Sequence, residues 1–362
     1  MTINSKFFTY SLLKHRSIFN FVIHRCLSSQ RPTLYETLKV IESSTDVFIQ
    51  PADSLFVFPN RKSVFGGQLI GSAVYAAQKT LTRDFPLHSL HSYFLTATDN
   101  SSDISYTVAR LRDGQSFETR SVTARQDNRI VFECSMNFHQ TEKGNMEHQL
   151  PMPHTDVTPP EKLLSMHDHF QNLLDDKRLK PELKPLIELA LQMPARIDVR
   201  HCHQRDLLEP EPVWPARELV WIKSLDPLPD YSHIHRSAVA YCSDRVLLHS
   251  AFLPYAINPY NRRIKMQASL DHSMWFHDDF IFDTTNDNNV IEEKVITKPV
   301  RRSSDIPPIP SKVPVRADDW LLYELECPIH MNNRAWTFGR IWSRNGRLIV
   351  TCAQEGVIRC HV

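Results

Sequence analysis

The chain has 362 residues, of which 41% are hydrophobic and 23% are charged, so it can bury a sizeable core and most naturally divides into two domains. Its formal net charge of +1 gives no general attraction to nucleic acid, and no apolar run reaches the ~18 residues that a membrane span needs. We therefore expect a globular protein with no nucleic-acid partner and no stable membrane insertion.

The glycine and cysteine patterns argue against several classes of protein. The eight glycines form no G-x-x-x-x-G-K, G-x-G-x-x-G or G-x-S-x-G motif, which disfavours phosphate-binding loops, Rossmann enzymes and serine-elbow hydrolases. The seven cysteines are scattered and contain no C-x-x-C pair, as is typical of a reducing compartment. His201, Cys202 and His203 stand together without further ligands at short spacing, so we expect no metal site.

Residues 1–35 have the composition of a mitochondrial targeting segment. They combine serines and bulky apolar residues with several basic residues, and no Asp or Glu precedes Glu36. The basic residues are Lys6, Lys14, Arg16, Arg25 and Arg31. A basic amphipathic helix is drawn to an anionic membrane surface, which favours import into the mitochondrial matrix. The alternative is a disordered tail without an address.

Residues 36–145 predict one α+β unit. An apolar stripe at helical spacing predicts a helix over 67–82, and Gly67 and Gly71 would let another backbone approach one of its faces. Four strands with turn residues between them follow, at 88–95, 104–112, 117–125 and 129–139. We expect an antiparallel sheet that wraps the helix.

Residues 146–195 predict a linker, and residues 196–362 repeat the first unit in outline. Prolines cluster in the linker, which should carry short helices near 161–174 and 185–192. The second unit should contain a helix over 231–250, strands that start near 196 and 217, and strands at 267–277, 320–326, 336–343 and 348–359. An extra stretch at 281–318 has little to bury and predicts a solvated, disordered loop.

The predicted strand over 267–277 contains polar residues that indicate a candidate active site. Its strict alternation places Ser269 on one face and His272 on the opposite face. Asp244, in YCSDRVLL, and Gln354, in TCAQEGVIR, are a carboxylate and an amide that could join Ser269 to position a water. The structural alternatives are that Asp244 caps a helix or forms a salt bridge, that Ser269 is an ordinary strand hydroxyl, that Gln354 is a surface amide and that His272 is a hydrogen-bonded core residue.

Six motifs in order resemble the type II acyl-CoA thioesterases: FGGQLIGSAVYAA, HSLHSYFL, LRDGQSF, AYCSDRVLL, SLDHSMWFH and AQEGVIR. The resemblance covers residues 36–280 and 319–362 and implies an α+β tandem double hotdog, in which each half is a long helix wrapped by an antiparallel sheet. It also implies hydrolysis of fatty acyl-CoA to free fatty acid and CoA, with no metal or bound cofactor. The family's catalytic Asp, Ser or Thr, and Gln fall on Asp244, Ser269 and Gln354.

Thioester hydrolysis needs an oriented water, a group that takes its proton, and donors for the oxyanion. We expect Asp244 to act on the water with Ser269 and Gln354 as its partners. Further oxyanion or substrate contacts are expected from the helix start and the strand, namely Gly66, Gly67, Gln68 and His272. Open sheet edges favour a homodimer or higher homo-oligomer.

Two other functions and a second compartment stay open. A hotdog enoyl-CoA hydratase or dehydratase usually pairs a His with a helical carboxylate, but neither His233 nor His235 is one helical turn from Asp244. A non-catalytic acyl-CoA-binding protein is the other alternative. The chain ends Cys360-His361-Val362 and lacks the S-K-L type address of some family members, so the peroxisome is the alternative to the mitochondrial matrix.

Overall fold

The computed structural model describes residues 32–361 except 59–60, 143, 145, 154–156, 193–194, 205, 207, 209–212, 256–263, 279, 281–308 and 311–312. Nearly all of the predicted targeting segment, and most of the predicted loop at 281–318, lie outside these residues.

The described residues form one antiparallel sheet of thirteen strands. The first half of the chain supplies β1 (Ile41–Ser44), β2 (Val47–Gln50), β3 (Leu87–Phe94), β4 (Ile104–Asp113), β5 (Phe117–Gln126) and β6 (Arg129–His139). The second half supplies β7 (Ile197–His201), β8 (Arg217–Ser224), β9 (Ile264–Ser269), β10 (Asp271–Phe276), β11 (Leu321–Met331), β12 (Arg334–Ser343) and β13 (Leu348–Cys360). The four strands predicted in the first half are confirmed to within one residue at each end.

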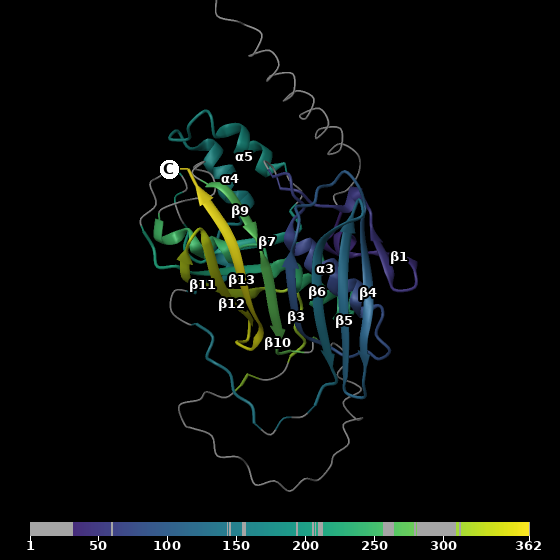
Figure 1. Cartoon of the computed structure of the whole chain (residues 1–362). Helices are drawn as coiled ribbons and strands as arrows, with labels where there is room; N and C mark the ends of the chain where they lie inside the picture. The colour runs from purple at the N-terminus through teal and green to yellow at the C-terminus, as the bar shows by residue number, and fades with distance from the viewer. Residues whose placement is uncertain are drawn as a thin grey trace, which may run out of the picture.

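The strand order confirms the predicted repeat. One half of the sheet runs β2-β4-β5-β6-β3, and the other runs β8-β11-β12-β13-β10 in the same pattern. The two halves join where β3 pairs antiparallel with β10, with His91 opposite Ser273, and Figure 1 shows these two strands side by side at the middle of the sheet.

Two helices pack against each other inside the fold, α3 (Gly66–Gln78) and α6 (Ser232–Ser243). A Cβ atom on Gly67 would lie 2.4 Å from the Tyr241 carbonyl oxygen, and one on Gly71 would lie 2.9 Å from that of Ser237. The two glycines therefore admit the backbone of α6, as their spacing predicted. The helix predicted over 231–250 is too long, because α6 ends at Ser243 and a 3-10 helix, η3 (Leu247–Ala251), follows.

The remaining helices are short. They are α2 (Leu34–Leu38), η1 (Ala52–Ser54), η2 (Pro160–Lys162), α4 (Met166–Asp175), α5 (Lys184–Leu191) and η4 (Leu253–Tyr255). Helices α4 and α5 confirm the two short helices predicted between the units, and they lie next to each other in Figure 1. They bury a small cluster of their own, formed by Phe170, Leu173 and Ile187.

The end of the predicted loop at 281–318 is not solvated. Val315 and Ala317 are 3% and 1% exposed and belong to the main core. The Ser224 N–H donates to the Ala317 carbonyl at 2.7 Å, and the Ala317 N–H donates to His235 Nδ1 at 3.0 Å. The expectation of a loop with nothing to bury is therefore wrong for these residues, because a histidine at the start of α6 fixes the chain before β11.

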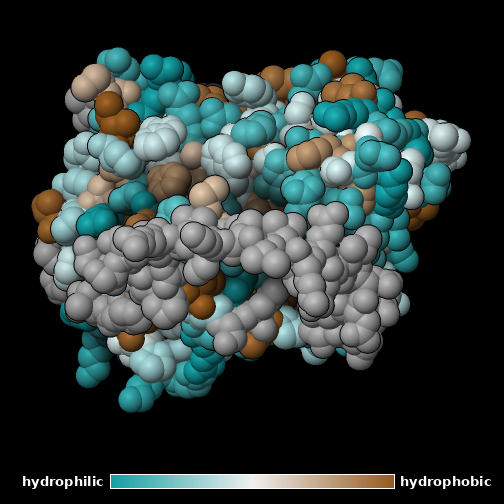
Figure 2. All heavy atoms as spheres, turned by 90° about the horizontal axis from the view of Figure 1, so that it is seen from below, coloured by the Kyte–Doolittle hydropathy of each residue, from teal (hydrophilic) through white to brown (hydrophobic). Residues whose placement is uncertain are grey.

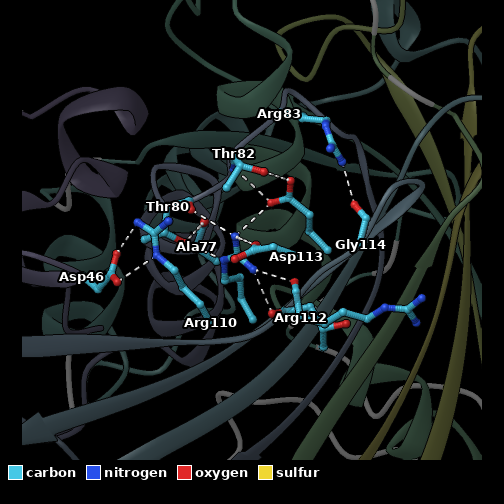
Figure 3. A network of polar contacts seen from close by, with 12 residues as sticks. Asp46, Ala77, Thr80, Thr82, Arg83, Arg110, Arg112, Asp113 and Gly114 are labelled. Carbon is cyan, nitrogen blue, oxygen red and sulfur yellow. Dashed lines mark hydrogen bonds and ion pairs between the residues drawn. The ribbon is translucent and has the colours of Figure 1, made fainter.

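A buried polar network fastens the chain after α3 to β5. Arg120 and Glu118 form an ion pair at 2.9 Å, and both side chains are fully buried. Arg120 also donates to Thr80 Oγ1 at 2.9 Å and to the Asp113 carboxylate at 2.6 Å, while the Thr82 N–H donates to Glu118 at 3.0 Å. Figure 3 shows Thr80, Thr82 and Asp113 converging on this network. Its groups satisfy one another, so it supports the scaffold.

Two further observations concern the surface. The residues drawn in colour in Figure 2 are mainly hydrophilic, with apolar residues scattered among them. Within the described part of the chain, every helix is too short or too polar to span a bilayer.

Candidate active site

The strand expected over 267–277 is broken into β9 and β10 at Leu270. Ser273 lies opposite Ala353 of β13, whereas Ser269 lies opposite Gly356. Four steps along one strand thus match three steps along its partner, which is the signature of a β-bulge. The extra residue turns Ser269 onto the same side of the sheet as His272, so the strict alternation predicted from the sequence is wrong at this point.

Asp244 lies where the ends of two helices meet. It is the C-cap residue of α6, and its carboxylate accepts a hydrogen bond from the N–H of Gly67, in the first turn of α3. The N-cap of α3 is Phe65, whose side chain cannot cap, so the carboxylate takes the place of a capping side chain. The positive end of the α3 dipole favours the ionised form of Asp244.

The structure brings Asp244, Ser269 and Gln354 together from α6, β9 and β13. Ser269 Oγ donates to Asp244 Oδ1 at 3.2 Å, and Gln354 Nε2 donates to the same oxygen at 2.9 Å. Gln354 Nε2 also donates to Ser269 Oγ. The amide nitrogen has two hydrogens, and both are used within this cluster.

The surroundings of the Asp244 carboxylate change its pKa in two opposite directions. Burial raises the pKa of Asp244 to about 6, while the hydrogen bonds from Gln354, Ser269 and Gly67 act in the opposite direction. A carboxylate of this pKa is ionised at neutral pH and holds a proton more strongly than an ordinary aspartate.

His272 is connected to the cluster through Gln354. Its ring is fully buried, with Nδ1 3.2 Å from Gln354 Oε1 and Nε2 2.8 Å from Ser243 Oγ. Burial lowers the pKa of His272 to about 4, so the ring is neutral at physiological pH. The hydrogen-bond partners of its side chain are Gln354 and Ser243.

The first residues of α3 have different surroundings. Gly66 lies beside the Asp244 carboxylate, whereas Gly67 and Gln68 hydrogen-bond to other parts of the protein. A Cβ atom on Gly66 would lie 2.8 Å from Asp244 Oδ2, so this glycine leaves space next to the carboxylate. The Gly67 N–H is taken up by Asp244. The side-chain amide of Gln68 bonds to the backbone of Thr37, Ser54 and Phe56, and its N–H donates to Phe65. Gly67 and Gln68 are thus used within the protein, whereas Gly66 lies directly beside the carboxylate.

Two supporting residues escaped the sequence argument. Ser243 bonds to His272, and the Tyr323 hydroxyl donates to the Ser243 carbonyl at 2.7 Å, which satisfies a carbonyl at the end of α6. The adjacency of Ser243 to Asp244 was the available signal for the first contact. No pattern in the sequence pointed to Tyr323, because its approach depends on how β11 packs against α6.

Comparison with known proteins places the chain in a family. Models of the acyl-CoA thioesterase N-terminal domain, of acyl-CoA thioesterase and of the acyl-CoA thioesterase C-terminal domain match residues 58–139, 213–294 and 310–358. The chain is similar to human acyl-coenzyme A thioesterase 8, with 34% identity over 82% of this chain and 81% of the relative. It is also 29% identical to acyl-CoA thioesterase 2 of Haemophilus influenzae, over 82% of this chain and 88% of the relative. The yeast peroxisomal acyl-coenzyme A thioester hydrolase 1 is 26% identical, over 60% of this chain and 72% of the relative.

Solved structures agree with the fold and the family. Acyl-CoA thioesterase II TesB2 of Mycobacterium marinum superposes with a TM-score of 0.62 and 28% identity, covering 91% of this chain and 99% of that one. A hot dog protein of unknown function from Alicyclobacillus acidocaldarius shares the fold at 15% identity, with a TM-score of 0.61 over 91% and 98% of the two chains. The predicted double hotdog is confirmed, and the chain belongs to the type II acyl-CoA thioesterase family.

Proposed function

We propose that this chain hydrolyses fatty acyl-CoA thioesters to free fatty acid and CoA with a water activated by Asp244, Ser269 and Gln354. The observation that carries the proposal is the convergence of Ser269 Oγ and Gln354 Nε2 on a single oxygen of Asp244, at 3.2 and 2.9 Å. Family membership supports the reaction, and the geometry supports the assignment of roles.

In this mechanism Asp244 is the general base. Its first oxygen is held by Ser269 and Gln354, and its second oxygen lies beside Gly66. The attacking water gives its proton to the carboxylate as its oxygen bonds to the thioester carbonyl carbon. The tetrahedral intermediate then expels CoA as the thiolate, which takes up a proton. We assign oxyanion stabilisation to the backbone N–H of Gly66, which has no hydrogen-bond acceptor among the described residues.

Release of CoA thiol from a panel of acyl-CoAs tests this proposal. Asp244→Asn and Gln354→Ala should each lower kcat by about 10²- to 10⁴-fold while the far-UV circular dichroism stays unchanged. Asp53→Asn and Gln204→Ala make the same chemical changes at exposed positions and should leave the rate unchanged. A folded Asp244→Asn variant with full activity would exclude the assignment.

The same experiment separates the two alternatives. Addition of water to an enoyl-CoA without thiol release would identify a hydratase. Tight acyl-CoA binding without any turnover would identify a binding protein. The approach of Gln354 and Ser269 to Asp244 favours the thioesterase, because a binding protein has no need for a buried carboxylate of raised pKa.

We also propose a homodimer or higher homo-oligomer. In the described residues β1 and β7 end the sheet, and unpaired strand edges commonly join a second copy. Light scattering should give a mass that is a multiple of 42.1 kDa, and the mass of one chain would contradict the proposal.

For the compartment two proposals compete. The basic residues of segment 1–35 support the mitochondrial matrix, and the printed name of the yeast relative supports the peroxisome. A fluorescent protein fused behind residues 1–35, compared with the full chain carrying the same label, decides between them. Mitochondrial signal from both fusions supports the matrix, whereas peroxisomal signal from the full chain supports the alternative.

A further inference from the structure

A closed ring of three hydrogen bonds and one peptide bond runs through two members of the cluster, Asp244 and Gln354. Asp244 accepts from Gln354, Gln354 Oε1 contacts His272 Nδ1 at 3.2 Å, and His272 Nε2 contacts Ser243 Oγ at 2.8 Å. Ser243 immediately precedes Asp244 in the chain, so the ring returns to its starting point through one peptide bond. It links the end of α6 to β10 and β13. Gln354 and His272 are 1% and 0% exposed, so water does not compete for these contacts.

The chemistry of the groups fixes the direction of the two bonds made by Gln354. An ionised carboxylate only accepts hydrogen bonds, so the amide nitrogen of Gln354 must face Asp244 and the amide oxygen must face His272. The amide oxygen also only accepts, so His272 carries its proton on Nδ1. The neutral ring then has a lone pair on Nε2, 2.8 Å from Ser243 Oγ, and the one hydroxyl hydrogen of Ser243 lies within reach of both this nitrogen and the Ala240 carbonyl at 2.9 Å. This tautomer of His272 gives the amide oxygen of Gln354 its donor.

We propose that His272 is a positioning residue that holds the side-chain amide of Gln354 in the orientation needed to donate to Asp244 and Ser269. The inference rests on the proposed function, since it concerns the same site. The side-chain hydrogen bonds of His272 are with Gln354 and Ser243 and not with Asp244 or Ser269, so its influence on the carboxylate passes through Gln354.

Loss of the Nδ1 donor has a definite consequence. The amide of Gln354 could then rotate by half a turn, which would aim its oxygen at the Asp244 carboxylate and remove a donor from it. The hydrogen bond from Gln354 lowers the pKa of Asp244, so a rotated amide would let that pKa rise further. Substrate binding does not involve this bond, so the effect should appear in kcat.

The test compares His272→Leu with His272→Asn. Leucine removes the donor, whereas the amide nitrogen of asparagine can stand close to the position of Nδ1. We expect His272→Leu to lower kcat by about 10- to 100-fold with little change in KM, and His272→Asn to stay within about threefold of the wild type. The acid limb of the pH–rate profile should move to higher pH only in the leucine variant. His277→Leu is the control, because His277 lies on the other face of the same sheet and bonds to Thr351 Oγ1 at 3.0 Å.

A double-mutant cycle guards against a purely structural effect. In the Gln354→Ala background, His272→Leu should cause no further loss beyond about twofold, because the group that it positions is already absent. Ser243→Ala leaves the histidine in place and should lower kcat by a smaller factor, so it tests the ring if His272→Leu folds poorly.

Three results would overturn the inference: equal losses in the leucine and asparagine variants, additive losses in the cycle, or full activity of His272→Leu. A fully active Asp244→Asn variant would instead exclude Asp244 as the base in the proposed function. The two failures are thus distinguishable.

Discussion

Asp244 combines burial with strong hydrogen-bond donors, and this combination predicts the acid limb of the pH–rate profile. Burial raises the pKa of Asp244 to about 6, although the bond from Gln354 lowers it. A general base must be ionised, so kcat should be highest above about pH 7 and fall roughly tenfold per pH unit below about pH 6. Gln354→Ala removes a donor and should move this limb to higher pH. Rates of thiol release between pH 4.5 and 8.5 measure it, and a limb near pH 4 would contradict the role of Asp244.

Gly66 is predicted to be required for the space that it leaves. A Cβ atom at this position would lie 2.8 Å from Asp244 Oδ2 and 2.9 Å from the Phe94 ring, so Gly66→Ala must displace one of them. Displacement of the base by a fraction of an ångström should lower kcat/KM by about 10²-fold. Gly144→Ala is the matched control, because its Cβ would meet no atom closer than 3.6 Å. Equal activity of the two variants would show that Gly66 is not close to the reacting groups.

The sequence predicted which residues form the cluster, but not on which face of the strand each of them lies. Asp244, Ser269 and Gln354 stand in long motifs that resemble one family, so their convergence followed from the resemblance. The side of the strand on which His272 lies was predicted wrongly, because alternation assumes one residue per step and the bulge at Leu270 adds another. A bulge depends on the pairing with β13, which no local pattern encodes.

At the scale of single elements, helix length shows the same limit. The apolar run through Leu247 and Leu248 predicted a helix to residue 250, but α6 ends at Ser243. Both leucines remain buried in η3, so apolar spacing reported burial correctly and the end of the helix wrongly. The end is set by tertiary contacts, among them the bond from Tyr323 to the Ser243 carbonyl. The early end places Asp244 against the first turn of α3.

The junction between α3 and β5 predicts a large stability effect. Arg120→Leu would leave Glu118 buried with Thr82 as its remaining partner, and an uncompensated buried charge costs about 3–5 kcal/mol. Arg110→Leu breaks the ion pair with Asp46, which Figure 3 also shows, but Arg110 is 40% exposed and the loss should stay below about 1 kcal/mol. Urea unfolding at neutral pH measures both. Equal losses in the two variants would show that burial does not decide the strength of these pairs.

For the whole molecule, the repeat was the most predictable feature. The two copies of one strand order are matched by similar patterns in the sequence. SLHSYF at β3 and SLDHSMWF at β10 are one such pair of segments. The direct pairing of β3 with β10 could not be read from either copy, because it is a contact between the halves. The buried end of the segment before β11 was missed for a related reason, since Val315 and Ala317 have apolar partners only in the folded core.

The stability of the whole molecule should fall in mild acid because it buries two neutral histidines. Burial lowers the pKa of both His235 and His272 to about 4, so between pH 6.5 and 4 the unfolded chain takes up protons that the folded chain refuses. Asp244 acts in the opposite direction, because its raised pKa lets the folded state bind a proton below about pH 6. Two histidines outweigh one aspartate, and the net loss should be on the order of 3 kcal/mol.

Urea unfolding at pH 7.5 and pH 4.5 measures this loss of stability. His272→Asn should reduce the loss, whereas His148→Ala, at an exposed position, should not. Equal stability at the two pH values would mean that the two rings are not held neutral in the core.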